Sequence, residues 1–405
     1  MNFAIIITVC VLLLLAYLFT ITSSKTKIPS VILLLLLGWV VRQLTGVLHI
    51  VIPDLNPLLP FFGTIGLILI VLEGSLELNL NKRKLPFVGK TLVTAIVPLI
   101  ITAFAIGHFF YYFLDADYKD GILNAIPLCI ISSSIAISSV GNLNVFNKEF
   151  AIYESSLSDI IGVLFFNFLA LNSVIDLDTV GHFGLQILIM LVISFVATAF
   201  LAFLLSRIDH HVKFAPIILL IILIFALSEI YHLPALIFIM LIGLFMGNFD
   251  ELERFKFIHK LKPRVLDKEV TKFKELVIEA AFLVRSLFFL LFGFLMETDE
   301  VLNPYTIEIA IGILIVIYLV RAIQLKVFKV KLMPLLFIAP RGLITILLFL
   351  SIPPEGKIPI VNKALIIQVI VLSSLMMMIG LIFNKKDENE KKLKLNELEN
   401  DDNVQ

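Results

Sequence analysis

Long apolar runs follow one another along almost the whole chain, and short polar stretches separate them. A membrane-spanning helix needs about 20 mostly apolar residues to cross a hydrocarbon core roughly 30 Å thick. The pair at 214–249 is divided only by a tight turn around Pro234. By this criterion the pattern predicts an all-α polytopic membrane protein with thirteen transmembrane helices, at residues 3–21, 28–46, 60–78, 89–114, 121–144, 150–174, 182–206, 214–230, 233–249, 274–297, 304–323, 332–352 and 364–384.

Composition agrees with this pattern. The chain has 405 residues, of which 60% are hydrophobic and only 16% are charged, whereas soluble domains are about a quarter charged. The 32 basic and 32 acidic residues give zero net charge, which excludes a basic protein that binds nucleic acid. Cys10 and Cys129 both lie in apolar runs, so we expect no disulfide framework, no cysteine metal site and no cofactor.

Lysine and arginine occur mainly in every second connection between the predicted helices. Lys82, Arg83 and Lys84 are one such group, and Arg42, at the end of the second helix, is an exception. Because positively charged loops stay in the cytoplasm, we expect a multi-pass protein of the cell (inner) membrane, with its N-terminus outside. Residues 385–405 form a short charged tail, which we expect to be cytoplasmic and disordered.

The helices divide into two halves of six around a connector. Residues 1–384 then form one transmembrane domain, with repeats at about 1–174 and 214–384 and a linker helix at 182–206. A single connecting helix gives the halves opposite orientations, as in transporters with inverted repeats, whose sites lie at interrupted helices. The fifth helix of each half carries residues that interrupt helices or permit close packing: Ser133, Ser134 and Ser138 in the first, and Pro340, Arg341, Gly342 and Thr345 in the second. We interpret both as interruptions at the membrane midplane; the alternative is that small residues only let helices pack closely.

Asp159 is the candidate for the chemistry. It lies about ten residues into a membrane-length segment, where a charge costs roughly 3 kcal/mol on insertion scales. Ser155 and Ser158 can supply hydroxyl oxygens to the same ligand, and hard oxygen donors suit Na⁺, K⁺ or a proton. Because loss of water favours the neutral form of a carboxyl group, a proton and a metal cation compete for it. The alternative is a structural aspartate paired with a neighbouring helix.

Two arginines also lie inside predicted helices. Arg285 and Arg341 each need a carboxylate or several carbonyl oxygens, because arginine does not lose its charge. One arrangement pairs Arg285 with an acid that takes no part in transport and leaves Asp159 free to titrate. Arg321, near a helix end, is interpreted as reaching the interface. The candidate partners of the two arginines are Asp159, Glu154, Glu73 and Glu279.

These residues resemble the monovalent cation:proton antiporter superfamily, which includes the sodium/hydrogen exchangers. The run Glu154-Ser155-Ser156-Leu157-Ser158-Asp159 is similar to that family's Glu-Ser-x-x-Asn-Asp helix. Pro340-Arg341-Gly342, with the apolar run to Pro353, looks like the Leu-Arg-Gly motif, and Gly74-Ser75-Leu76-Glu77 looks like the element before a basic loop. Ser133-Ser134-Ile135-Ala136 looks similar to the unwound crossing helix. The resemblance covers residues 5–384.

The resemblance implies that Asp159 binds the cation and the proton, that two broken helices cross near it, and that the protein is a homodimer. This sequence departs from the family pattern at Ser158, where Asn or Asp is usual, and it lacks an Asp-Pro pair in the unwound helix. A single central acid favours electroneutral one-for-one exchange.

The sequence therefore predicts a secondary-active Na⁺ or K⁺/proton antiporter in a lipid bilayer. Its cation site is expected at Asp159, Ser158, Ser155, Ser133 and Ser134. The alternative is a cation-coupled symporter of a small organic solute on a similar fold, and a non-transporting sensor is a third reading. An intramembrane enzyme is not expected, because it needs a second acid or a nucleophile with its base.

Overall fold

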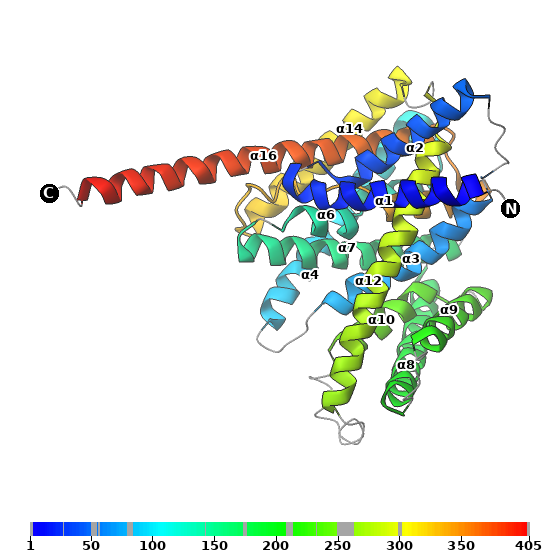
Figure 1. Cartoon of the computed structure of the whole chain (residues 1–405). Helices are drawn as coiled ribbons and strands as arrows, with labels where there is room; N and C mark the ends of the chain where they lie inside the picture. Colours follow the sequence, from blue (N-terminus) through cyan, green and yellow to red (C-terminus); the bar gives the residue numbers. More distant parts are fainter. Residues whose placement is uncertain are drawn as a thin grey trace.

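The computed structural model describes residues 3–26, 28–49, 55, 57–78, 84–141, 143–172, 176–207, 214–231, 233–248, 263–298 and 302–402. These residues form α-helices and connections, and no β-strand occurs among them. The helices, shown in Figure 1, are α1 (Phe3–Thr26), α2 (Ser30–Val47), α3 (Leu58–Glu77), α4 (Leu85–Leu114), α5 (Tyr118–Cys129), α6 (Ser133–Ser139), α7 (Val145–Leu171), α8 (Leu177–Arg207), α9 (Phe214–Ile230), α10 (Ala235–Gly247), α12 (Pro263–Phe294), α14 (Pro304–Val327), α15 (Leu343–Leu350), the 3-10 helix η2 (Pro354–Gly356) and α16 (Lys363–Asp402).

Each of the thirteen predicted segments contains helix. Within the described ranges, nine spans are long and apolar enough to cross a membrane, and three shorter apolar helices accompany them. Two predicted segments are not continuous helices. The segment 121–144 holds α5 and α6 with a break between them, and in 332–352 regular helix is confined to α15.

The helices pack in two groups. The first, which we call the α4 group, joins α4, α5, α6, α7, α14, α15 and α16 through their mutual contacts. The second, the α12 group, joins α1, α2, α3, α8, α9, α10 and α12. The groups meet where α7 lies against α3 and α10, where α15 lies against α3, and where α6 lies against α1.

Close packing inside the α12 group depends on two glycines. A methyl group added at Gly38 of α2 would lie 2.2 Å from the carbonyl oxygen of Leu290 on α12. One added at Gly293 of α12 would lie 2.3 Å from the carbonyl oxygen of Leu35 on α2. The two backbones therefore approach each other at distances that only glycine permits, as is typical of helix pairs in membranes.

The last helix extends beyond the bundle. α16 runs from Lys363 to Asp402 and projects away from the other helices in Figure 1. It therefore includes most of the 385–405 tail, and the expected disorder of that tail stays a prediction.

Candidate functional site

The two interrupted segments meet at their breaks. After α5 ends at Cys129 the backbone is extended, and the N–H of Ser132 donates to the carbonyl oxygen of Pro340, 2.8 Å away. Gly342 lies at the same contact, because a methyl group there would be 2.4 Å from Ser132 Oγ. The hydroxyl of Thr345 accepts from the Gly342 N–H at 3.4 Å and caps the start of α15. The segments expected to be irregular are thus irregular, and they touch.

Arg341 holds this contact together from a buried position. Its Nε donates to the carbonyl oxygen of Leu128 at 2.8 Å and its Nη2 to that of Cys129 at 3.2 Å, while Nη1 donates to Ala339. The carbonyls that end α5 have no partners in their own helix and carry the negative end of its dipole. Of the two environments expected for Arg341, the structure contains the second, several carbonyl oxygens, and no ion pair of Arg341 occurs among the described residues.

Asp159 lies beside the break after α5. The residue is 4% exposed, and its Oδ2 accepts from the backbone N–H of Ser133 at 3.2 Å. Its Oδ1 is buried and has no hydrogen-bond partner among the described residues. One carboxylate oxygen is therefore fixed against the interrupted backbone, and the other is available to a ligand.

The other predicted ligands differ in what they do. Ser158 Oγ accepts from the Ile131 N–H at 3.0 Å, so it satisfies a donor that the break releases. Ser155 Oγ donates to the carbonyl oxygen of Ile152, 3.2 Å away. Ser134 Oγ lies 3.1 Å from Ser132 Oγ, and the exposed Ser138 donates to carbonyls of its own helix. The structure gathers Asp159, Ser158 and Ser133 at one place, and their roles in binding stay predictions.

Glu154, five residues before Asp159 on α7, has a different environment. Its Oε2 lies 2.8 Å from Arg321 Nη2, and its Oε1 accepts from Gln324 Nε2 at 2.9 Å. Gln324 also donates to the carbonyl oxygen of Thr94 on α4, at 2.7 Å. Arg321 is 3% exposed and also donates to Leu335, so the expectation that it reaches the interface is wrong. The sequence contained a signal for this cluster, because Arg321 and Gln324 are polar residues three positions apart on one face of an otherwise apolar helix.

Arg285 takes another of its candidate partners. Its Nη1 lies 3.8 Å from Oε2 of Glu73 on α3, and the two side chains are 18% and 16% exposed. Glu279 is exposed, and no ion pair of Glu279 is found in the part of the chain that the structure describes. Neither Arg285 nor Arg341 forms an ion pair with Asp159 in the described part of the chain.

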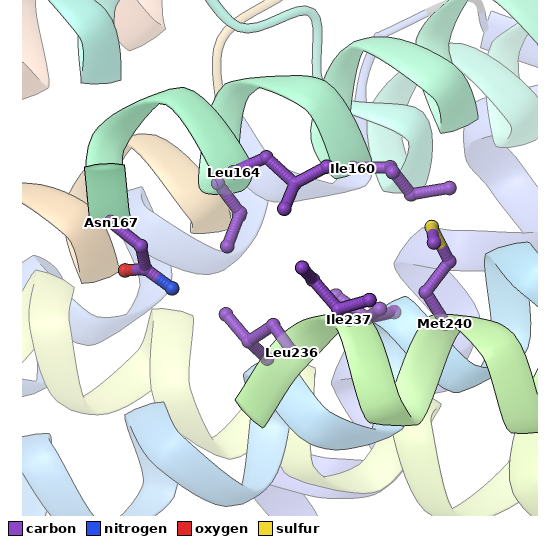
Figure 2. A pocket seen from close by; sticks show the side chains of 8 residues that line it. Ile160, Leu164, Asn167, Leu236, Ile237 and Met240 are labelled. Atoms are coloured by element: carbon purple, nitrogen blue, oxygen red, sulfur yellow. The ribbon is translucent and has the colours of Figure 1, made fainter. Parts of the chain in front are cut away.

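Two cavities border the Asp159 region. One lies between the helix groups, and Figure 2 shows Ile160 and Leu164 of α7 pointing toward α10. Asn167 is the polar member of an otherwise apolar lining, which comprises Val71, Ile160, Val163, Leu164, Asn167, Leu236, Ile237 and Met240. The second cavity has a mixed lining, and its polar residues include Thr94, Thr102, Ser158, Gln324 and Arg341. The described residues contain no group of three or more His, Cys, Asp or Glu side chains that would hold a metal ion.

Comparison with solved structures gives the same architecture. The sodium proton antiporter MjNhaP1 from Methanocaldococcus jannaschii at pH 8 is 20% identical, with a TM-score of 0.66 over 93% of this chain and 95% of that one. An electron-microscopy structure of MjNhaP1 is 19% identical, with a TM-score of 0.67 over 98% of both chains. Identities this low show the fold alone.

A search of curated proteins finds no match to this chain. The family described as "Sodium/hydrogen exchanger, transmembrane" matches residues 10–385, which is nearly the whole sequence. The match includes both interrupted segments and Asp159. The chain therefore belongs to the sodium/hydrogen exchanger family, a family of membrane transporters and not of enzymes.

Proposed function

We propose that this protein is a secondary-active antiporter that exchanges a monovalent cation, Na⁺ or K⁺, for a proton by alternating access. The observation that carries the proposal is Asp159, a buried carboxylate with one oxygen on a backbone N–H and the other without a partner. The family and the fold support a cation/proton antiporter in general terms. The cation, the stoichiometry and the competition at Asp159 are the parts that we add.

The mechanism follows from the cost of charge in an apolar interior. A bare carboxylate is expensive to bury, and a proton or a cation neutralises it. The site at Asp159 therefore switches its access from one face of the membrane to the other when it holds either ligand. When it holds neither, the site stays open to one face. Exchange is obligatory because both ligands need the same carboxylate.

A monovalent cation fits the groups that surround Asp159. Around Asp159 the hydrogen bonds of the described residues involve backbone N–H groups and the Ser158 hydroxyl, and none of these bonds involves a second carboxylate. One negative charge balances one Na⁺ or K⁺, or one proton, so we infer electroneutral one-for-one exchange. If voltage alone drives transport in vesicles, this stoichiometry is wrong.

The wider arrangement belongs to the same proposal. We infer two inverted repeats of six helices whose broken helices cross at the Ser132–Pro340 hydrogen bond. We also infer an N-terminus outside the cell membrane, a cytoplasmic C-terminus and a homodimer. Native mass spectrometry in detergent tests the last point, because a dimer gives twice the mass of the 45.5 kDa chain.

The test is dissipation of a pH gradient in proteoliposomes, followed by a fluorescent dye. Na⁺, K⁺ and Li⁺ are added in turn to vesicles that contain the wild type, Asp159→Asn or Asp178→Asn. Asp178 is a matched control, because it is exposed in the first turn of α8. We expect dissipation by at least one cation in the wild type and the control and none in Asp159→Asn. Folded wild-type protein that responds to no cation contradicts the proposal and favours an organic solute.

A further inference from the structure

A second buried oxygen beside Asp159 also lacks a partner. Ser156 is 2% exposed, and its Oγ makes no hydrogen bond to any of the described residues. Ser156 and Asp159 are three residues apart on α7, so their side chains lie on neighbouring positions of one helix face. Buried hydroxyl groups in proteins almost always have a partner, and an unpaired one is a reason to look for a ligand.

The neighbouring serines are already engaged. Ser155 Oγ donates to Ile152 of its own helix, and Ser158 Oγ accepts from Ile131 at the break. Along Glu154–Asp159, the unpartnered side-chain oxygens are therefore Ser156 Oγ and Asp159 Oδ1. These are also the oxygens that are free to bind something else.

Ser156 faces Gly74 of α3. A methyl group built on Gly74 of α3 would lie 3.7 Å from Ser156 Oγ and 3.9 Å from its Cβ, and it would meet nothing else within 4 Å. Gly74 therefore leaves space in front of the hydroxyl, although the backbone there does not require glycine.

This space lies between α3 and α7, two of the helices that line the apolar cavity between the helix groups. On α7, Ser156 lies about one turn before Ile160 and two turns before Val163, both of which line that cavity. On α3, Gly74 lies one turn after Val71, which lines it from the other side. Ser156 thus lies one turn from Ile160, whose side chain Figure 2 shows at the cavity between α7 and α10.

We propose that Ser156 Oγ is a ligand of the transported cation together with Asp159 Oδ1, and that Gly74 keeps open the space the cation occupies. This inference rests on the proposed antiport function. Hydroxyl and carboxylate oxygens form a hard donor pair, which suits Na⁺ or K⁺. Ser158 then positions the broken backbone through Ile131 and is not itself a ligand.

Four variants test the proposal against one control. Ser156→Ala removes the oxygen, Ser156→Cys replaces it with a soft sulfur, and Ser156→Thr keeps a hydroxyl. Gly74→Ala adds a methyl group that the resting structure accommodates but that fills the space beside Ser156 Oγ. Ser194→Ala is the control, since Ser194 is a buried serine of α8 that donates only to Met190 of its own helix.

Two measurements are made on protein that is monodisperse in detergent. The first is the cation concentration for half-maximal exchange in proteoliposomes, and the second is the rise in unfolding temperature on addition of Na⁺ or Li⁺. Loss of one charge-assisted interaction weakens binding about tenfold. We expect that loss in both readouts for Ser156→Ala, Ser156→Cys and Gly74→Ala, and values close to the wild type for Ser156→Thr and Ser194→Ala.

The ligand assignment is overturned if Ser156→Ala keeps the wild-type cation affinity in both readouts. It is equally overturned if only the maximal rate falls, because that result describes a residue that affects movement and not binding. Failure of the proposed function gives a different result, since the wild type itself then shows no cation-dependent exchange and no cation-dependent stabilisation.

Discussion

Two buried carboxylates on α7, Glu154 and Asp159, have opposite environments. Both oxygens of Glu154 have partners, Arg321 at 2.8 Å and Gln324 at 2.9 Å. Asp159 has one backbone N–H at 3.2 Å and an oxygen without a partner among the described residues. A fully paired buried ion is tied to the fold, whereas a partly paired one is suited to exchange its counter-ion. Burial alone does not distinguish a structural acid from a functional one; pairing does.

The comparison is tested most strongly by removing a partner of Glu154. Arg321→Met leaves a carboxylate buried without its counter-charge, which costs about 3–5 kcal/mol of stability. We expect its fall in unfolding temperature to exceed that of any substitution at Arg341, Arg285 or Lys84. The double variant Glu154→Gln/Arg321→Met recovers much of that loss, because no unpaired charge is left. If Arg321→Met unfolds at the wild-type temperature, the pair does not stabilise the fold.

Arg341 extends the comparison to a cation that meets only carbonyls. Arg341→Met removes the donors to Leu128 and Cys129 at the end of α5. A neutral carbonyl left unpaired costs less than a charge left unpaired, so we expect a clear but smaller destabilisation than for Arg321→Met. Hydrogen exchange of the backbone near Ser132, followed by mass spectrometry, is expected to rise. Unchanged exchange there means that the arginine does not hold the break.

Glu73 is an intermediate case, since it is half-buried and lies 3.8 Å from Arg285. The N–O distance in its ion pair is longer than that of the Glu154 pair, and the side chain of Glu73 is more exposed than that of Glu154. We expect Arg285→Gln to lower stability by about 1 kcal/mol or less. The measurement is the unfolding temperature of Arg285→Gln, compared with that of Arg321→Met under the same conditions. A fall as large as for Arg321→Met contradicts the ranking by burial and pairing.

The smallest effect is expected at an exposed pair near the starts of two spans, α4 and α7. Lys84 donates to Glu149 at 2.8 Å, and the side chains are 39% and 37% exposed. This hydrogen bond raises the pKa of Lys84 above its ordinary value of 10.5. The stabilisation is thus complete below pH 10.5 and is lost as pH rises through the higher folded value.

At neutral pH we expect Lys84→Met to cost about 0.5 kcal/mol or less. Unfolding temperatures of both proteins, measured from pH 7 to pH 11, are expected to converge at the alkaline end. A difference that grows with pH contradicts the sign of this prediction.

The sequence predicted the elements well because apolar length and helix-breaking residues are local signals. The breaks near Ser132 and Pro340 and the burial of Asp159 needed no knowledge of neighbouring helices. The partners of the buried charged side chains, in contrast, could be identified only from the positions of the neighbouring helices. Arg321 and Glu154 lie 167 residues apart, and only the packing of α14 against α4 brings Arg321 to α7. Residue type alone left four candidate acids for each arginine.

Two further features depended on the same packing. Arg42 was an exception to the loop charge pattern, and in the structure it donates to the carbonyl oxygen of Met296, 2.8 Å away, just after α12 ends. Ser156 was one of three serines between Glu154 and Asp159, and nothing in residue type set it apart. Its unpaired hydroxyl is visible only once α3 and the break are in place.

The most direct test of the difference between the two carboxylates is proton release on cation binding, measured in weakly buffered detergent solution. The cation that drives exchange is added to the wild type, Glu154→Gln and Asp159→Asn, each confirmed to be folded. We expect release of about half a proton per bound cation from the wild type and Glu154→Gln at the pH at which the site is half protonated, approaching about one proton at lower pH, and none from Asp159→Asn. Proton release from Asp159→Asn equal to that of the wild type contradicts the assignment of exchange to Asp159.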